Sequence, residues 1–252
     1  MGDMEMNELS PNDASRFSQL EQIISPDMVE WALQKTYEFA RLMSYYKCAM
    51  MEIETKLNVL NEEFSLRFDR QPISSIHTRL KQPISIHNKL VARGLPITVE
   101  SIEKGLNDIA GIRVICSFED DVYKLAEALL KQDDISLIQR KDYIQNPKPN
   151  GYRSLHLIVA VPIFLEHEKR IMRAEVQLRT IAMDSWASLE HQLRYKKGNS
   201  FDESMTDELK RCAELSVELD VRMDHLRSII YTDVSNTVLP GLENAIGTVH
   251  QS

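Results

Sequence analysis

Cysteines are scarce in this sequence. Its 252 residues include three of them, Cys48, Cys116 and Cys212, which lie far apart and form no C-x-x-C or similar metal-ligand spacing. So low a count excludes a disulfide scaffold and fits a reducing compartment, so we expect a cytoplasmic protein. Residues 1–15 carry acidic side chains and no basic one, which is not the pattern of a secretion signal.

Long apolar runs and an excess of positive charge are also absent. No apolar stretch approaches the ~20 residues that a membrane-spanning helix requires, so we expect no membrane partner. Asp and Glu number 38 against 30 Lys and Arg, a net charge of −8. An acidic total argues against a nucleic acid as the main partner, although it leaves room for a local basic pocket. The 43% of hydrophobic residues suffices for a folded core.

The order of the expected elements predicts an α+β (mixed α/β) fold. The stretch 27–68 contains no Pro or Gly and predicts one long helix or two, and further helices are expected at 83–93, 98–106, 119–131, 181–197 and 203–230. Compact, β-branched segments predict strands at 111–116, 135–144, 154–165 and 171–178. Short connections favour a mixed sheet of about five strands flanked by helices, with long N- and C-terminal helices. We expect a flexible segment over 1–25, one folded domain over 26–231 and a loose tail over 232–252.

Residues 71–99 hold a local concentration of positive charge. They contain no acidic residue and four basic ones, Arg79, Lys81, Lys89 and Arg93. On the expected helix Lys89 and Arg93 are four residues apart and share a face, which suits a polyphosphate. Taken alone, this pattern fits a solvated basic face better.

Two carboxylates lie at positions suited to metal binding or catalysis. Asp108 precedes the strand 111–116 and could hold Mg²⁺ with substrate phosphates, although an Asp at such a place is more often a cap. The strand 174–179 alternates strictly, so that one face carries Glu175, Gln177 and Arg179. That face is either solvated or the floor of a polar site, in which Glu175 could act as a general base toward a sugar hydroxyl.

The segment 148–156 combines turn residues with polar side chains. Pro149 and Gly151 shape a turn, after which Tyr152 offers a ring for a base, a contact worth ~1–3 kcal/mol. His156 lies on the polar face of the strand that follows. Each also has a plainer interpretation, as a rim aromatic and a surface histidine.

Together these segments resemble the synthetase domain of RelA/SpoT-type alarmone enzymes. The resemblance spans about residues 30–230 and rests on five blocks in order: RLKQPISIHNKL (79–90), NDIAGIRVIC (107–116), KDYIQNPKPNGYRSLH (141–156), EVQLRT (175–180) and MDSWASLEH (183–191). It implies that the domain over 26–231 is a catalytic domain of the single-domain, small alarmone synthetases. The block 141–156 looks closer to the RelP type than to the RelQ type.

The resemblance implies a reaction and a set of site residues. ATP donates its β,γ-pyrophosphate to the 3′-hydroxyl of GDP or GTP, and AMP leaves. Asp108 and Glu175 would be catalytic and would hold Mg²⁺, with Glu175 activating the hydroxyl. ATP would be bound by Arg79, Lys81, Ser85, Lys89, Arg93 and Arg113. GDP or GTP would be bound by Tyr152, Lys148, Asn150, Arg153, His156, Gln177 and Arg179.

The family resemblance also implies an oligomeric state and a regulatory ligand, and two alternative functions remain. Its small members commonly form homotetramers, and some bind (p)ppGpp at a second, regulatory site. Toxin-type relatives place pyrophosphate on tRNA 3′ ends or on adenine nucleotides, but residues 198–230 show no basic patch for tRNA. A degenerate, non-catalytic nucleotide binder is the other rival. The presence of both Asp108 and Glu175 argues against it.

Overall fold

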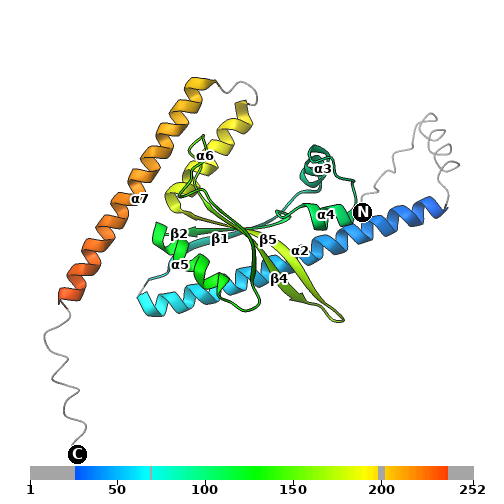
Figure 1. Ribbon diagram of the computed structural model, residues 1–252, viewed down its shortest axis with the longest axis horizontal. Helices are drawn as coiled ribbons and strands as arrows, with labels where there is room; N and C mark the ends of the chain where they lie inside the picture. The colour runs from blue at the N-terminus through cyan, green and yellow to red at the C-terminus, as the bar shows by residue number, and fades with distance from the viewer. Residues whose placement is uncertain (1–25, 69, 198–201, 238–252) are drawn as a thin grey trace, which may run out of the picture. The chain divides into compact units, whose positions relative to one another are not determined.

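A computed structural model describes residues 26–68, 70–197 and 202–237 of the chain. The chain forms two compact units, Met1–Tyr45 and Tyr46–Ser252. The long helix α2 (Pro26–Phe68) begins in the first unit and continues into the second, which contains the other helices and strands of the described residues (Figure 1). The expected flexible segment 1–25 and the end of the expected tail, 238–252, lie outside the described residues.

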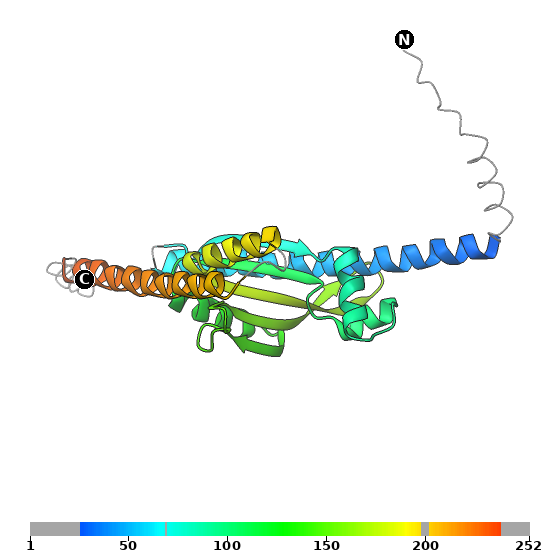
Figure 2. The same ribbon diagram turned by 90° about the horizontal axis from the view of Figure 1, so that it is seen from above.

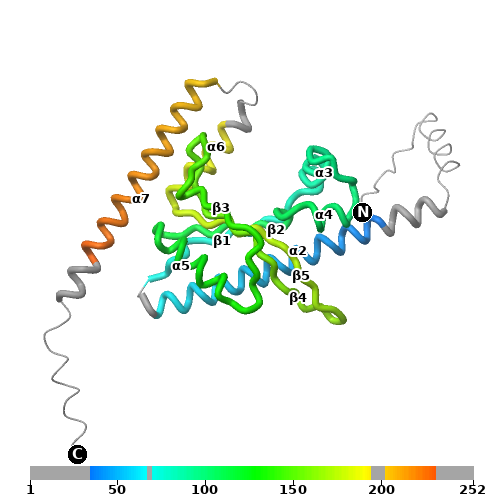
Figure 3. Tube along the Cα trace, viewed as in Figure 1, coloured from blue at the N-terminus to red at the C-terminus, as the bar shows by residue number. Residues whose placement is uncertain are grey.

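The second unit alternates helices and strands around one sheet. Its elements in chain order are β1 (Ile73–Leu80), α3 (Pro83–Ala92), α4 (Val99–Gly105), β2 (Ala110–Cys116), α5 (Glu119–Leu130), β3 (Ser136–Asp142), β4 (Leu155–Phe164), β5 (Lys169–Thr180), α6 (Ile181–Lys197) and α7 (Glu203–Thr237). The Cα trace in Figure 3 follows the same order. Of the helices in the described ranges, none is both long and apolar enough to cross a bilayer.

The sheet has five strands in the order β1-β2-β5-β4-β3. β2 and β5 pair in parallel, and the other neighbours are antiparallel. A parallel pair needs a crossover connection, and here α5, β3 and β4 supply it. The expected α+β fold with a mixed sheet of about five strands is confirmed.

Alternation along the central strands separates a core face from a polar face. Ala174, Val176 and Leu178 of β5 are fully buried. α5 contacts β2 and β5, and it buries its own apolar stripe, Val122, Leu125, Ala126 and Leu129. The part of α2 after residue 45 is tied to this unit, because Asn61 Oδ1 accepts a hydrogen bond from the backbone N–H of Ile73 (3.0 Å).

Strand β1 has no counterpart among the strands expected from the sequence. It lies at the edge of the sheet, and its residues His77, Thr78 and Arg79 are exposed. An edge strand that buries little apolar surface lacks the period-2 hydrophobic signal by which strands are recognised. The number of strands was therefore predicted correctly, but the position of the fifth strand was not predicted.

The helix boundaries otherwise follow the expected signals. The stretch 27–68 is one helix, α2. Thr98 caps α4 by accepting a hydrogen bond from the N–H of Ser101, and Gly94 ends α3 with a positive φ of 64°. Because no Pro or Gly interrupts it, α7 continues to Thr237, so the first residues of the segment expected to be a loose tail are helical.

Helices α6 and α7 lie side by side (Figures 1 and 2) and hold the turn before β4. Trp186 and Ala187 of α6 form a buried cluster with Leu209 and Ala213 of α7, and Tyr152 packs against it. Gly151 has a φ of 90°, and a Cβ added to it would lie 2.5 Å from the Cβ of Ala213. Gly151 is thus required both for its backbone conformation and for the close approach of α7.

We predict that Gly151→Ala destabilises the fold more than Gly94→Ala does. Both glycines have positive φ, which costs an alanine about 1–2 kcal/mol. Gly94 has open space where a Cβ would be, whereas Gly151 meets Ala213, which adds ~1–3 kcal/mol of overpacking. Urea unfolding of the two variants measures the difference. Equal midpoints would show that α7 does not press on the turn.

Candidate active site

Strand pairing arranges polar side chains in two rows across the sheet. One row, from β1 to β4, is His77, Arg113, Gln177 and His156, and the next is Arg79, Gly111, Glu175 and Ile158. Directly paired residues point to the same face of a sheet. Gly111, which has no side chain, leaves open space between Arg79 and Glu175.

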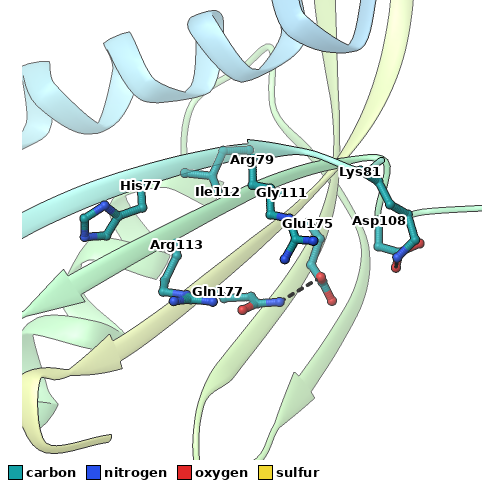
Figure 4. A pocket seen from close by; sticks show the side chains of 9 residues that line it. All are labelled: His77, Arg79, Lys81, Asp108, Gly111, Ile112, Arg113, Glu175 and Gln177. Carbon is teal, nitrogen blue, oxygen red and sulfur yellow. Dashed lines mark hydrogen bonds and ion pairs between the residues drawn. The ribbon is translucent and has the colours of Figure 1, made fainter. Parts of the chain in front are cut away.

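A cavity of about 520 Å³ lies over these rows (Figure 4). Its lining contains six residues predicted from the sequence, Arg79, Lys81, Asp108, Arg113, Glu175 and Gln177. It also contains three that were not predicted, His77, Gly111 and Ile112. His77 lies two residues before Arg79, so strand periodicity would have placed it on the same face if β1 had been recognised.

Asp108 is held between two lysines. Its Oδ2 accepts hydrogen bonds from Lys81 Nζ at 2.9 Å and from Lys89 Nζ at 2.5 Å. Burial alone would raise the pKa of this carboxyl, but the two lysines outweigh burial and lower the pKa below its ordinary value. The carboxylate therefore stays ionised, and it links Lys81, which follows β1, to Lys89 of α3.

Glu175 is the second ionised carboxylate of the cavity. His156 Nδ1 lies 3.0 Å from its Oε1, and Gln177 donates to its Oε2 at 2.9 Å. Burial and the charge of Asp108 raise the pKa of Glu175. These two hydrogen bonds and the charge of His156 lower it by a larger amount, so the net shift is downward. Asp108 and Glu175 line the same cavity.

A hydrogen-bond network extends from Glu175 to the loop before β4. His156 Nε2 and the Tyr152 hydroxyl are 2.8 Å apart, and Arg179 donates to the same hydroxyl at 2.5 Å. Arg179 also pairs with Asp184 (3.1 Å), to which Arg113 points at 3.4 Å. Asp184 belongs to the block 183–191 but was given no role from the sequence. Its position at the start of α6 carries no chemical signal by itself.

Cations lie over the aromatic rings of the loop. Lys148 Nζ is 4.6 Å from the ring centroid of Tyr152 and 4.8 Å from that of Tyr143. The Arg179 guanidinium carbon is 5.0 Å from the Tyr152 ring. Tyr143, which was not predicted as a site residue, meets both Tyr152 and His156 edge-on. The Tyr152 ring is therefore a platform that already attracts flat or cationic groups.

Nine predicted residues lie outside the cavity lining: Lys89, Lys148, Tyr152, His156 and Arg179, whose contacts are given above, and Ser85, Arg93, Asn150 and Arg153. Ser85 is on α3, and the Arg93 guanidinium donates to the carbonyl of Gly105 (2.6 Å) and so ties α3 to α4. Asn150 accepts from the N–H of Tyr152 (3.2 Å) and donates to Glu190 (3.3 Å). Arg153 pairs with Glu119 (2.7 Å). Their nucleotide contacts stay predictions.

Buried polar atoms without partners gather at this site. Among the described residues, Asp108 Oδ1, Arg113 Nε and Arg179 Nε are buried and make no hydrogen bond. Such atoms are costly unless a ligand completes them. One is an anionic oxygen and two are cationic donors, so the set fits a metal ion together with phosphate groups.

Asp108 and Glu175 are the residues that fit Mg²⁺. Within the described ranges, no cluster of three or more His, Cys, Asp and Glu side chains could hold a metal. Mg²⁺ does not require one, because it commonly binds one or two carboxylates and completes its shell with substrate phosphates and water. The free Oδ1 of Asp108 is suited to that arrangement.

Comparisons with known proteins agree with this geometry. A family model described as a region found in RelA / SpoT proteins matches residues 78–200, the part of the chain from β1 to α6. GTP pyrophosphokinase YwaC of Bacillus subtilis is 44% identical over 178 residues, which cover 71% of this chain and 85% of that protein. The chain belongs to the RelA/SpoT family.

Solved structures of the RelA/SpoT family share the fold. Small alarmone synthetase 2 of Bacillus subtilis superposes with a TM-score of 0.70 at 40% identity, covering 76% of this chain and 98% of that one. Small alarmone synthetase 1 of the same organism, bound to its product pppGpp, gives a TM-score of 0.70 at 32% identity, with coverage of 77% and 99%. The resemblance to the small synthetases is confirmed, and the RelP-like subtype stays a prediction.

We predict that Asp108→Asn changes how the free energy of unfolding depends on pH. The lowered pKa of Asp108 means that its ionised form stabilises the fold above the unfolded pKa, and this contribution is lost as pH falls through the folded pKa. The stability gap between the unmodified protein and the variant should therefore shrink between about pH 5 and pH 3. Urea unfolding of the ligand-free protein across that range measures the gap. Asp207→Asn, at an exposed residue of α7, is the control, and a gap of constant size for Asp108→Asn would contradict the prediction.

Proposed function

We propose that this chain is a (p)ppGpp synthetase, a GTP diphosphokinase that transfers the β,γ-pyrophosphate of ATP to the 3′-hydroxyl of GDP or GTP and releases AMP. One observation carries the proposal. In a member of the RelA/SpoT family, the ionised carboxylate of Glu175 shares a cavity with Asp108 and with the basic side chains of β1 and β2. That combination suits phosphoryl chemistry on a hydroxyl acceptor.

ATP would occupy the basic end of the cavity. Arg79, Lys81 and Arg113 line it, and Lys89 reaches it through Asp108. Lysine and arginine side chains bind phosphates through charge-assisted hydrogen bonds. Ser85 and Arg93 of α3 would complete this side. The cations now held by Asp108 would then be shared with the triphosphate.

GDP or GTP would lie on the side of Tyr152. Its ring would stack on guanine, and Lys148, an exposed residue now over that ring, would turn to a phosphate. His156, Gln177 and Arg179 surround the same place. The related small alarmone synthetase 1 is bound to its product pppGpp, which supports a guanosine polyphosphate as a ligand of this chain.

The reaction needs alignment, charge neutralisation and one proton acceptor. The 3′-oxygen forms a bond with the β-phosphorus while the bond from that phosphorus to the α,β-bridging oxygen breaks, and AMP leaves with that oxygen. Glu175 accepts the hydroxyl proton. Mg²⁺, bound by Asp108 and Glu175, would supply charge neutralisation on the phosphates. His156 and Gln177 hold the carboxylate in place and ionised.

The proposal extends to the oligomeric state and the cellular compartment. Exposed apolar residues follow one face of α7 at spacings of three and four, Leu215, Leu219, Met223, Leu226 and Ile230. Such a stripe would support the homotetramer that the family suggests, which sedimentation of the full chain tests. A regulatory (p)ppGpp site would depend on that assembly. The cysteines Cys48, Cys116 and Cys212 are unpaired, which fits the cytoplasm.

We predict that Glu175→Gln abolishes synthesis and leaves the fold intact. The amide has the shape of the carboxylate but cannot take the proton, so kcat should fall by ~100-fold or more. The assay incubates the protein with ATP, Mg²⁺ and GDP or GTP, and it resolves the nucleotides by anion exchange. AMP should appear in step with a guanosine tetra- or pentaphosphate. AMP formation only with tRNA or an adenine nucleotide would favour the toxin-type reaction, and substantial turnover by the variant would refute the role of Glu175.

We predict that Tyr152→Ala weakens the guanine nucleotide far more than ATP. Loss of a stacking ring worth ~1–3 kcal/mol should raise KM for GDP by about 5- to 150-fold. Tyr152→Phe keeps the ring and loses only the bonds to His156 and Arg179, so it should retain much of the affinity. Tyr37→Ala, at an exposed tyrosine, is the control. Equal losses for both substrates would contradict stacking.

A further inference from the structure

Helix α7 touches three successive residues of the loop that carries Tyr152. The Cβ of Ala213 lies where a side chain of Gly151 would be. Tyr152 packs against the cluster that contains Leu209 and Ala213. The next residue, Arg153, forms an ion pair with Asp220 of α7, in which Arg153 Nη1 lies 3.7 Å from the carboxylate oxygen Oδ2 and makes no hydrogen bond. Helix α7 therefore contacts the loop at Gly151, Tyr152 and Arg153.

These contacts come from one face of α7. Leu209, Ala213, Ser216 and Asp220 are spaced by four, three and four residues, which places them in one line along a helix. Ser216 and Ala213 enclose a gap of only about 10 Å³ with Gly151, Arg153, Met183 and Trp186. This face of α7 is thus tightly packed against the loop. It differs from the face that carries the exposed apolar stripe of the same helix.

Asp220 also holds the strand that carries the catalytic carboxylate. Thr180 Oγ1 donates to Asp220 Oδ2 at 2.8 Å. Thr180 is the last residue of β5, the strand of Glu175, Gln177 and Arg179, and its hydroxyl oxygen also accepts from the N–H of Met183 in α6. One carboxylate therefore links α7 to the end of β5 and to the residue after Tyr152.

The link is buried. The side chains of Arg153 and Asp220 are each 10% exposed. Arg153 keeps a second partner, Glu119 at the start of α5, by its Nη2 at 2.7 Å. These contacts direct the guanidinium of Arg153 toward α5 and α7. Its place in the structure is that of an anchor for the loop.

We propose that Asp220 is a positioning residue, which, through Arg153 and Thr180, sets where Tyr152 stands relative to Glu175 and so sets the affinity for the guanine nucleotide. This inference rests on the proposed function. It assigns to Arg153 an effect through the loop in place of a direct contact with the nucleotide. It also makes the packing of α7 a determinant of acceptor binding, with little effect on ATP.

The test compares Asp220 with a second carboxylate of the same helix. Asp220→Ala removes both links, and Asp220→Asn removes the charge while its amide oxygen can still accept from Thr180. Burial raises the pKa of Asp220, so a neutral amide is tolerated there, and Arg153 retains Glu119. Glu218→Gln is the matched control, because Glu218 is exposed and pairs only with Arg222 among the described contacts.

The readouts are the Kd of a fluorescent GDP analogue, measured without turnover, and KM for GDP and for ATP. Asp220→Ala should raise the Kd and KM for the guanine nucleotide about tenfold, the scale of coupling through a packed network. KM for ATP should stay near its original value. Asp220→Asn should show a smaller rise in the same direction, and Glu218→Gln none. If Asp220→Ala does not fold, Asp220→Asn carries the test.

Arg153→Ala and the double variant complete a cycle. If both residues act through the loop, their effects on the Kd of GDP are not additive. Additive effects, an unchanged Kd in folded Asp220 variants, or equal changes for GDP and ATP would each overturn the inference. Failure of the proposed function would look different, because the unmodified protein would then form no guanosine polyphosphate while the Kd comparison could still be made.

Discussion

The parallel pairing of β2 with β5 is the constraint on which the site depends. Its register places Gly111 beside Glu175 and Arg113 beside Gln177, so that a carboxylate stands next to open space and a cation next to an amide. Shifting that register by one residue would turn Glu175 into the core. The buried partners Ala174, Val176 and Leu178 prevent the shift, because they would then be exposed. Apolar packing on one face thereby fixes the chemistry on the other.

The two carboxylates are kept ionised by different means. Lys81, which follows β1, and Lys89 of α3 hold Asp108, whereas His156 and Gln177 hold Glu175. A carboxylate that already pairs with lysines can share them with an incoming polyphosphate. A carboxylate held by an amide and an imidazole keeps its charge for a metal or a proton. The difference in partners suits the two different roles proposed for them.

Much of the fold follows from sequence patterns, and six of the fifteen predicted site residues line the cavity. The alternation in 174–179 placed Glu175 and Gln177 on the polar face, and both line the cavity. β1 escaped recognition because an exposed edge strand has no hydrophobic alternation, and His77 was missed with it. Asp184 was missed because its partners, Arg113 and Arg179, come from two other segments. Arg153 was predicted to bind the nucleotide, because no sequence pattern indicates its contacts with Glu119 and Asp220.

The sequence by itself determined the local structures, the family and the residue types that phosphoryl transfer needs. Those properties depend on periodicity, turn residues and motifs, which are short-range features of the chain. The tertiary structure alone decided which of these residues meet. Asp108 meets Lys81 and Lys89, His156 meets Glu175, and Asp220 joins Thr180 to Arg153. The hydrogen bonds among these residues span 19 to 40 positions of the chain. Such pairings arise from strand order and helix packing, which no local pattern encodes.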